Sequence, residues 1–378
     1  MIQTLVIYIG LLAIMLAFAQ YSAKKERLNP QPSRLPLSLD MLIPALLFAG
    51  VLSLRYIDAD GNDYFTYLEI YRFGAGGYEK EPGFKYLVDG LRAVGAHFTA
   101  YFFCLGFIEI TCLYLAFKEK RFLLPALILF LFIGNTFITW QNVIRQSIAC
   151  CIFIYSVQYI DKRQPWKYLL CCLLAIAFHK SALILPLLYL LFIKKDNFFT
   201  SIWLQVAVVL VAFVVKMKIN TLDSLYELVN NIGPLIGYDN YNSNNAEALT
   251  FDRKSWVGPF VFMVFDLMII CFSKKMREKY NSRYFNIAYT LFFIGLIAHM
   301  LFAGLIIFYR PFMYFTMFKM VIEAYFIHYC FTNLTQINLL SVTSYLFAHF
   351  AYFIYYTILN CQANNTIFTF YWQVPGVQ

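Results

Sequence analysis

The stretch FLLPALILFLFIGNTFITWQNVIRQSIACCIFIYSVQYI, residues 122–160, decides the fold class. It holds two apolar runs, residues 122–139 and 142–160, and each is close to the roughly 20 residues that a helix needs to cross a bilayer. Arg145 is its one charged residue. Because the bilayer core has no water to satisfy backbone groups, such runs cross it as helices. The stretch predicts two membrane-spanning helices, with a charge near the start of the second.

The composition of the whole chain agrees with this interpretation. Of its 378 residues, 61% are hydrophobic and only 13% are charged, and the mean hydropathy is +0.62. These values exclude a water-soluble protein, and the uninterrupted apolar runs exclude a membrane β-barrel, whose strands alternate in polarity. The net charge of +9 could suit nucleic acid, but the basic residues form short clusters between apolar runs, so a nucleic-acid partner is rejected.

Ten apolar runs are predicted to span the membrane, and an eleventh region is interrupted. That region, residues 166–193, has His179-Lys180-Ser181 at its middle and basic residues at both ends. Since both flanks favour the cytoplasm, we interpret it as a hairpin of two short helices, either re-entrant or fully spanning. The prediction is an all-α polytopic membrane protein of about twelve helices in a single domain, residues 1–378. The ten runs are residues 2–20, 37–54, 98–117, 122–139, 142–160, 198–215, 256–272, 284–302, 312–331 and 339–359.

The distribution of charge predicts the orientation. More than half of the 30 Lys and Arg residues fall in short loops on one side of the predicted topology, which the positive-inside rule assigns to the cytoplasm. Both termini then lie outside, together with two long loops, residues 55–97 and 216–255. Each outer loop shows helical spacing of apolar residues and is expected to contain an amphipathic helix. The positions are Phe84, Leu87, Leu91 and Val94 in the first loop, and Leu222, Leu225, Val229 and Ile232 in the second.

The first outer loop has the side chains that carry chemistry. Its acidic residues outnumber its basic ones, and they alternate with tyrosines, as is common where carboxylates bind sugar hydroxyls and aromatic rings stack on sugars. A solvated loop that folds on itself is the plainer alternative. Asp63 and Glu81 are the candidate general bases here, although either could instead orient an arginine.

Metal and cofactor sites are not expected. Of the nine cysteines only Cys361 lies near an aqueous end, and none has a disulfide or metal-ligand spacing. One alternative is Ca²⁺, because residues Asp58 to Glu69 place oxygen donors at several positions of an EF-hand loop. Asp63 occupies the sixth position, where that loop needs Gly, so a chance overlap is favoured.

Five short motifs, in order along most of the chain, resemble the EpsG family. The resemblance implies a Wzy-type polysaccharide polymerase in the bacterial cytoplasmic membrane, active at the outer face. It implies transfer of a growing glycan from undecaprenyl pyrophosphate to a lipid-linked repeat unit, as in exopolysaccharide and O-antigen synthesis, with membrane lipid and a chain-length regulator as partners. The motifs are Arg55; Gly61, Asp63, Tyr64 and Tyr67; Glu81-Pro82-Gly83-Phe84; Arg145-Gln146; and Phe178-His179-Lys180-Ser181-Ala182.

That reaction needs cations to neutralise the pyrophosphate leaving group and a base to take the acceptor's proton, and no metal is required. Arg55, Arg145 and Arg310 each stand at the outer end of a predicted span, where they could bind phosphate or simply anchor the helix. Function is favoured for Arg145, since a charge inside an apolar span is costly. Displacement without a covalent intermediate inverts the anomeric centre.

His179 could act as the general base or as a hydrogen-bond donor to phosphate, with a histidine satisfied in the core as the alternative. The resemblance adds Asp60, Tyr64, Tyr67 and Gln146 to the substrate-binding residues. Elsewhere, Lys319 and Glu323 lie four apart on one helix and are expected to neutralise each other, while Asp266 has no explanation.

Three other functions remain open. A flippase for lipid-linked oligosaccharides also has about twelve helices, but it should carry its cations in a central cavity reachable from both faces. An O-antigen ligase would share the arginines and the histidine, and a membrane acyltransferase is a further alternative. Labelled lipid-linked repeat units would separate these classes by product.

Overall fold

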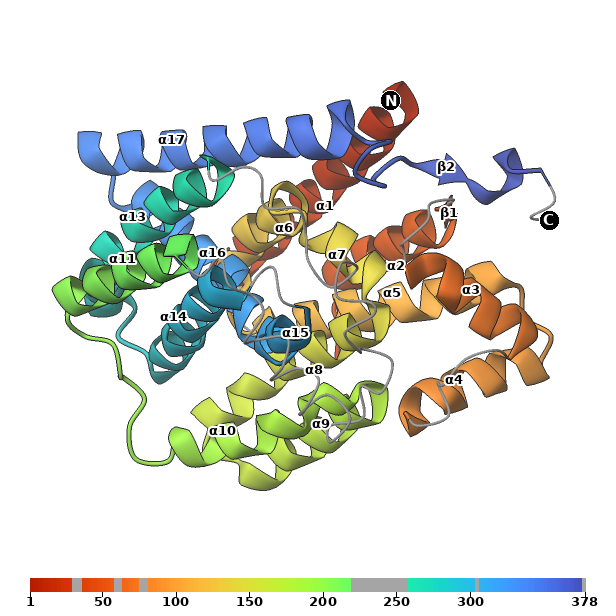
Figure 1. The fold of residues 1–378 in the computed structure, drawn as a ribbon, viewed down its shortest axis with the longest axis horizontal. Coiled ribbons are helices and arrows are strands. Elements are labelled where there is room, and N and C mark those ends of the chain that lie inside the picture. Colours follow the sequence, from red (N-terminus) through yellow and green to blue (C-terminus); the bar gives the residue numbers. More distant parts are fainter. Residues whose placement is uncertain (29–35, 58–62, 75–80, 219–256, 303–305, 376–378) are drawn as a thin grey trace. The chain divides into compact units, whose positions relative to one another are not determined.

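The computed structural model describes residues 1–28, 36–57, 63–74, 81–218, 257–302 and 306–375, and nearly all of its regular structure is helical (Figure 1). The contacts divide the chain into two compact units, each described separately below: Met1–Leu190 with Glu323–Gln378, and Leu191–Ile322. The helical membrane class is confirmed, while the single domain stays a prediction.

The first unit contains most of the helices. The α-helices wholly within it are α1 (Ile2–Leu28), α2 (Leu39–Ser53), α3 (Asp63–Phe73), α4 (Pro82–Ala93), α5 (Phe98–Phe117), α6 (Leu124–Ile133), α7 (Thr136–Asn142), α8 (Ile144–Asp161), α9 (Pro165–Phe178) and α17 (Gln336–Phe353). Its short elements include η2 (Arg121–Leu123), η3 (Lys180–Ile184), the π-helix η6 (Ile354–Leu359), and strands β1 (Arg55–Tyr56) and β2 (Thr369–Phe370). Two helices run across its boundary with the second unit, α10 (Leu185–Leu191) and α16 (Phe318–Thr332).

Four helices among the described residues are long and apolar enough to cross a membrane: Ile2–Leu28, Phe98–Phe117, Arg283–Phe302 and Gln336–Leu359. A fifth span is possible if the bent pair Arg121–Ile133 and Thr136–Asn142 counts as one. Several shorter apolar helices accompany them, including Leu39–Ser53 and Pro165–Phe178. The predicted total of twelve and the orientation therefore stay predictions.

The core of the first unit forms where α8 packs between α5 and α9. Most α8 side chains are buried, as expected for a helix that is apolar on every side. Nearby, α2 packs closely against α5, because Gly106 faces the backbone of Ala49: a methyl group on Gly106 would lie 3.7 Å from the Ala49 Cα. Small residues of this kind let membrane helices approach each other.

The segment predicted as one span over residues 122–139 forms two helices with a sharp bend between them. Helices α6 and α7 meet at an angle of 61° across Gly134 and Asn135, and Asn135 has a left-handed backbone with φ 57°. Gly134 leaves no room for a side chain, since a Cβ there would lie 2.6 Å from the Phe130 carbonyl oxygen. A second break at Val143 separates α7 from α8, so Arg145 lies in the first turn of α8.

The predicted hairpin over residues 166–193 is present. The helices α9 and α10 are separated by His179 and η3, and the Tyr168 hydroxyl donates a hydrogen bond to the Leu185 carbonyl at 2.6 Å. In one continuous helix these two residues would be about 25 Å apart, at 1.5 Å per residue. The segment therefore folds back at His179.

The two ends of the first unit differ in chemistry. At one end, β1 pairs antiparallel with β2, opposing Arg55 to Phe370, while the Tyr8 hydroxyl of α1 binds the Thr366 carbonyl at 3.0 Å. The beginning of α1, the start of the first outer loop and the C-terminal segment thus lie together, as they must if all three share one side of the membrane.

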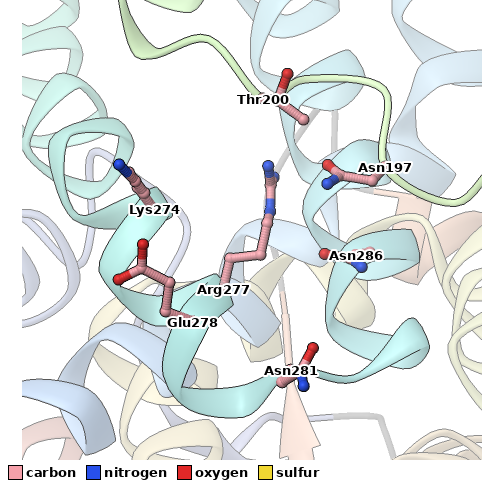
Figure 2. Close-up of a pocket in the computed structure, with 7 residues that line it drawn as sticks. All are labelled: Asn197, Thr200, Lys274, Arg277, Glu278, Asn281 and Asn286. Atoms are coloured by element: carbon pink, nitrogen blue, oxygen red, sulfur yellow. The ribbon is translucent and has the colours of Figure 1, made fainter.

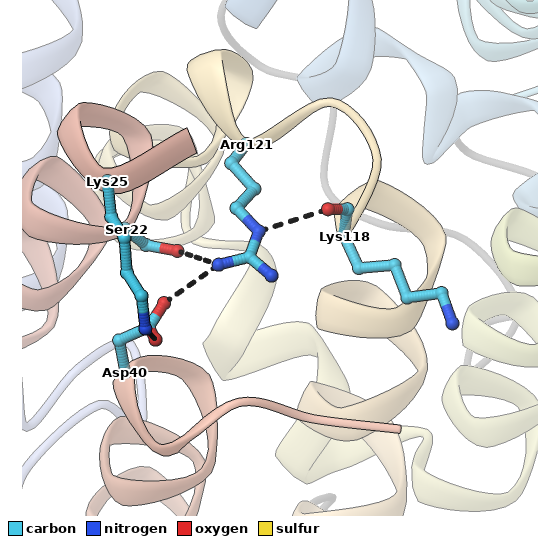
Figure 3. Close-up of polar contacts among 5 residues, drawn as sticks. All are labelled: Ser22, Lys25, Asp40, Lys118 and Arg121. Carbon is cyan, nitrogen blue, oxygen red and sulfur yellow. Dashed lines mark hydrogen bonds and ion pairs between the residues drawn. The ribbon is translucent and has the colours of Figure 1, made fainter. Parts of the chain in front are cut away.

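The other end holds the basic residues that the sequence assigns to the cytoplasm (Figure 3). Asp40 lies between two cations, 2.9 Å from Lys25 Nζ and 3.2 Å from Arg121 Nη1. Arg121 also donates to the Lys118 carbonyl at 3.1 Å. These bonds join the end of α1, the start of α2 and the turn before α6.

The second unit contains α11 (Ile202–Lys218), α13 (Val257–Tyr280), α14 (Arg283–Phe302) and α15 (Ile306–Thr316). The predicted span over residues 312–331 is interrupted at Met317, between α15 and α16. The backbone of Phe315 is pressed against α14 at Gly295, where an added Cβ would lie 2.5 Å from the Phe315 carbonyl carbon. The predicted helix at Leu222, Leu225, Val229 and Ile232 lies outside the described residues.

The expected pairing of Lys319 with Glu323 stays a prediction, and each of the two residues has a further partner. Lys319 Nζ lies 2.7 Å from Asp266 Oδ1, which explains the carboxylate that the sequence left without a role. Glu323 accepts a hydrogen bond from the Tyr345 hydroxyl at 2.7 Å and lies 3.5 Å from His349 Nε2.

Candidate functional site

Four segments that are distant in sequence meet around Arg145 in the first unit. Arg145 Nη1 lies 2.6 Å from Glu81 Oε2, and the other oxygen of Glu81 accepts the backbone N–H of Lys180 at 3.3 Å. The guanidinium carbon lies 5.8 Å from the ring centre of Tyr67 and 5.5 Å from that of Phe84. We call Tyr67, Glu81, Phe84, Arg145 and the backbone of Lys180 the Arg145 cluster.

Local structure explains why Glu81 points at Arg145. Glu81 is the N-cap of α4, with Pro82 at the first helical position, where its fixed backbone suits a helix start. Arg145 lies in the first turn of α8, and a carboxylate is favourable near a helix N-terminus. Glu81 is 6% exposed, whereas the Arg145 side chain remains 28% exposed. Both observations indicate that the Glu81 carboxylate orients Arg145 rather than taking a proton from the substrate.

The Arg145 guanidinium still has N–H donors that can bind an anion. Its Nε is buried and has no hydrogen-bond partner among the described residues, and leaving such a donor unpaired costs about 1–3 kcal/mol. A guanidinium presents its donors in a fixed fork that matches two phosphate oxygens. With the first turn of α8 beside it, the cluster has the chemistry of an anion site.

The first outer loop forms the amphipathic helix that we predicted, with a somewhat different buried face. Phe84 and Val88 of α4 are fully buried, while Val94 is 76% exposed because it caps the helix end. At Gly83, α4 approaches α9 so closely that a methyl group would lie 3.0 Å from Ala177 Cβ. This contact joins the loop to the hairpin that carries His179.

His179 sits at the break of the hairpin, 8% exposed and next to the Lys180 N–H that binds Glu81. Its Nδ1 accepts the backbone N–H of Ser181 at 3.3 Å and lies 2.7 Å from the Ser181 hydroxyl. A ring nitrogen that accepts an N–H is unprotonated, so in the neutral ring Nε2 carries the proton. This geometry favours His179 as a donor over His179 as a base.

Asp63 lies on the same side of α3 as Tyr67. The two are four residues apart on the helix, and the backbone N–H of Asp63 is held at 3.0 Å by Asn142 Oδ1, three residues before Arg145. Burial raises the pKa of the Tyr67 hydroxyl, Arg145 lowers it, and the Asp63 charge raises it. Asp63 is therefore near the Arg145 cluster and is the remaining candidate base.

Arg55 and Tyr64 are used in packing. Arg55 is 1% exposed, and its guanidinium binds Gln141 Oε1 together with the carbonyls of Asn365 and Ile367, at 2.7 and 3.0 Å. Tyr64 stacks on Phe102 at 4.5 Å and donates to the Arg55 carbonyl. In this arrangement Arg55 connects the loop to the C-terminal segment and Tyr64 connects it to α5, and the roles of both in binding stay predictions.

The other predicted site residues are placed differently. Gln146 is 2% exposed in α8, beside Arg145. Arg310 belongs to α15 in the second unit and is partly exposed. Asp60 and much of the proposed Ca²⁺ loop lie outside the described residues, and within the described part no group of three or more His, Cys, Asp or Glu could hold a metal.

Sequence reasoning missed Gln141 and Asn142, which bind Arg55 and the Asp63 backbone. The signal was present, since the two carboxamides lie four and three residues before Arg145 at the edge of an apolar run. It also missed that the Phe84 ring lies 5.5 Å from the guanidinium carbon, because neither helical spacing nor a short motif shows which residue Phe84 contacts.

Comparison with known families assigns the chain. The model of the EpsG family matches residues 39–371, which include every residue of the Arg145 cluster. This chain belongs to the EpsG family. The assignment agrees with the resemblance of the short motifs and indicates a membrane protein of exopolysaccharide or polymerase type. No curated protein and no solved structure matches the chain.

Proposed function

We propose that this EpsG-family protein is a polysaccharide polymerase of the bacterial cytoplasmic membrane, with its active site on the outer face. It transfers a glycan from undecaprenyl pyrophosphate to the sugar hydroxyl of a lipid-linked repeat unit. The observation that carries the proposal is the meeting of the outer-loop residues Tyr67 and Glu81 with the hairpin turn at Lys180 around the partly exposed Arg145.

In the proposed reaction the acceptor oxygen attacks the anomeric carbon, and the bond between that carbon and the pyrophosphate oxygen breaks. The leaving lipid pyrophosphate takes the electron pair, and its growing negative charge is stabilised by Arg145, which Glu81 holds in place. His179 adds a hydrogen bond from Nε2. Asp63 takes the proton from the acceptor hydroxyl.

The cellular test is complementation of a deletion strain. Arg145→Ala should insert normally but yield no long glycan chains, because the leaving group loses its cation. Arg121→Lys serves as the control, since that cation binds Asp40 at the opposite end of the unit. Normal chain-length ladders from Arg145→Ala would refute the proposed site.

A further inference from the structure

A polar pocket lies at one end of the second unit, away from any residue assigned a role so far (Figure 2). It has a volume of about 420 Å³, within the range of small-molecule sites. It forms between the last turns of α13, the first turn of α14 and the segment before α11. Its charged lining consists of Lys274, Arg277 and Glu278, two cations against one carboxylate.

The pocket contains polar atoms that the protein leaves unsatisfied. Arg277 Nε, Asn197 Oδ1 and Asn286 Oδ1 are buried and have no hydrogen-bond partner among the described residues. Two contacts hold the Arg277 side chain in position: Nη2 donates a hydrogen bond to the Phe199 carbonyl at 3.0 Å, and the guanidinium carbon lies 5.1 Å from the ring centre of Tyr289. In Figure 2 its side chain extends between Lys274 on one side and Asn197 and Asn286 on the other.

These atoms specify a ligand with two properties. The guanidinium, with Lys274 beside it, favours phosphate oxygens. The two carboxamide oxygens accept hydrogen bonds, so they need a ligand that also carries hydroxyl groups. Inorganic phosphate alone would leave the carboxamide oxygens poorly matched, whereas a phosphate ester of a polyol satisfies both sets.

The surrounding sequence indicates which side the pocket faces. Lys275, Lys279 and Arg283 lie within the same turn region, and the positive-inside rule assigns this end of α13 and α14 to the cytoplasm. A ligand of this pocket would then come from the cytoplasm or from the inner leaflet.

We propose that this pocket binds a hydroxylated phosphate ester, with Arg277 and Lys274 on the phosphate and Asn197 and Asn286 on the hydroxyl groups. Two sources share that chemistry, a soluble sugar phosphate and the glycerol phosphate headgroup of phosphatidylglycerol. The proposal is independent of the polymerase reaction.

The test uses the full-length protein in phosphatidylcholine nanodiscs. One arm titrates glucose 1-phosphate by calorimetry, and the other adds phosphatidylglycerol and counts the lipids retained in native mass spectra. The variants are Arg277→Gln, Lys274→Gln and the nearly isosteric Asn286→Leu, which removes the amide oxygen that would accept a hydrogen bond from the ligand's hydroxyl groups. Lys275→Gln is the matched control, because it removes the same charge from a neighbouring residue that does not line the pocket.

We expect binding of one probe to the wild type, about tenfold weaker binding in each pocket variant, and unchanged binding in Lys275→Gln. Binding of glucose 1-phosphate identifies a soluble ligand, and retention of phosphatidylglycerol identifies a lipid. Lys274 is exposed and can be replaced without disturbing the fold, so the test survives if Arg277→Gln misfolds. Binding of neither probe, or equal losses in the control, would overturn the proposal.

Discussion

At the scale of single residues, the account depends on what each charge in the first unit contacts. Arg145 and Arg55 both stand at the end of an apolar run, and the sequence favours function for Arg145 because its charge lies inside the predicted span. The structure separates them: Arg145 keeps 28% of its side chain exposed, whereas Arg55 is buried against backbone carbonyls. The backbone acceptors of Arg55 belong to the C-terminal segment, more than 300 residues away in the sequence. No pattern in the sequence around Arg55 could therefore reveal them.

Replacing Glu81 by Gln tests its role as the residue that holds Arg145. Gln keeps the shape but loses the charge, so the partly buried arginine loses its counter-ion. We expect a loss of about 1–2 kcal/mol of unfolding free energy and a marked fall in polymer length, with the protein still inserted. Thermal unfolding in detergent and glycan gels measure the two effects. Unchanged values for both would show that the ion pair is incidental.

His179 variants distinguish a donor from a base. Gln places an amide N–H close to the position of imidazole Nε2–H, while Ala removes the donor altogether. If His179 donates a hydrogen bond, His179→Gln should keep substantial activity and His179→Ala should lose at least tenfold. Polymer yield from the two purified variants decides this, and equal loss in both would favour a proton-transfer role instead.

At the scale of elements, hydropathy located the helices well and their breaks poorly. The span predicted for residues 98–117 coincides with α5, and the hairpin at residues 166–193 is present, because apolar length and flanking charges are local properties. The break at Gly134–Asn135 coincides with the left-handed backbone of Asn135, and the break at Met317 follows the close approach of the Phe315 backbone to Gly295 of α14. Hydropathy reports neither of these backbone features.

Gly83 tests whether the approach of α4 to α9 assembles the Arg145 cluster. Gly83→Ala would place a methyl group 3.0 Å from Ala177 Cβ and 3.1 Å from its carbonyl oxygen, so α4 must move. We expect a lower unfolding temperature and at least a tenfold loss of activity. Gly90→Ala on the same helix is the control, since it meets nothing within 4 Å and should be neutral or slightly stabilising. Identical behaviour of the two variants would contradict the contact.

At the scale of the whole molecule, the C-terminal segment connects distant parts of the first unit. It pairs with β1, supplies the acceptors of Arg55 and binds Gln3 and Tyr8 of α1. The sequence predicted that both termini share a side with the first loop, but the pairing itself could not be read from two short, non-periodic segments.

Deleting residues 365–378 should therefore destabilise the protein more than a loss of surface chain would. Arg55 would remain buried without two of its acceptors, an arrangement that costs several kcal/mol. We expect low membrane abundance and rapid proteolysis. Deletion of residues 376–378 alone keeps both acceptors and serves as the control. Wild-type abundance of the longer deletion would show that Arg55 finds other partners.

The central claim is that this chain polymerises lipid-linked repeat units by itself, using the Arg145 cluster. It is tested most directly by incubating the purified protein in liposomes with radiolabelled, undecaprenyl-pyrophosphate-linked repeat units and no second acceptor. The account predicts long labelled glycans and released lipid pyrophosphate with the wild type, and neither product with Arg145→Ala. Redistribution of intact repeat units across the bilayer without chain growth would contradict it and identify a flippase.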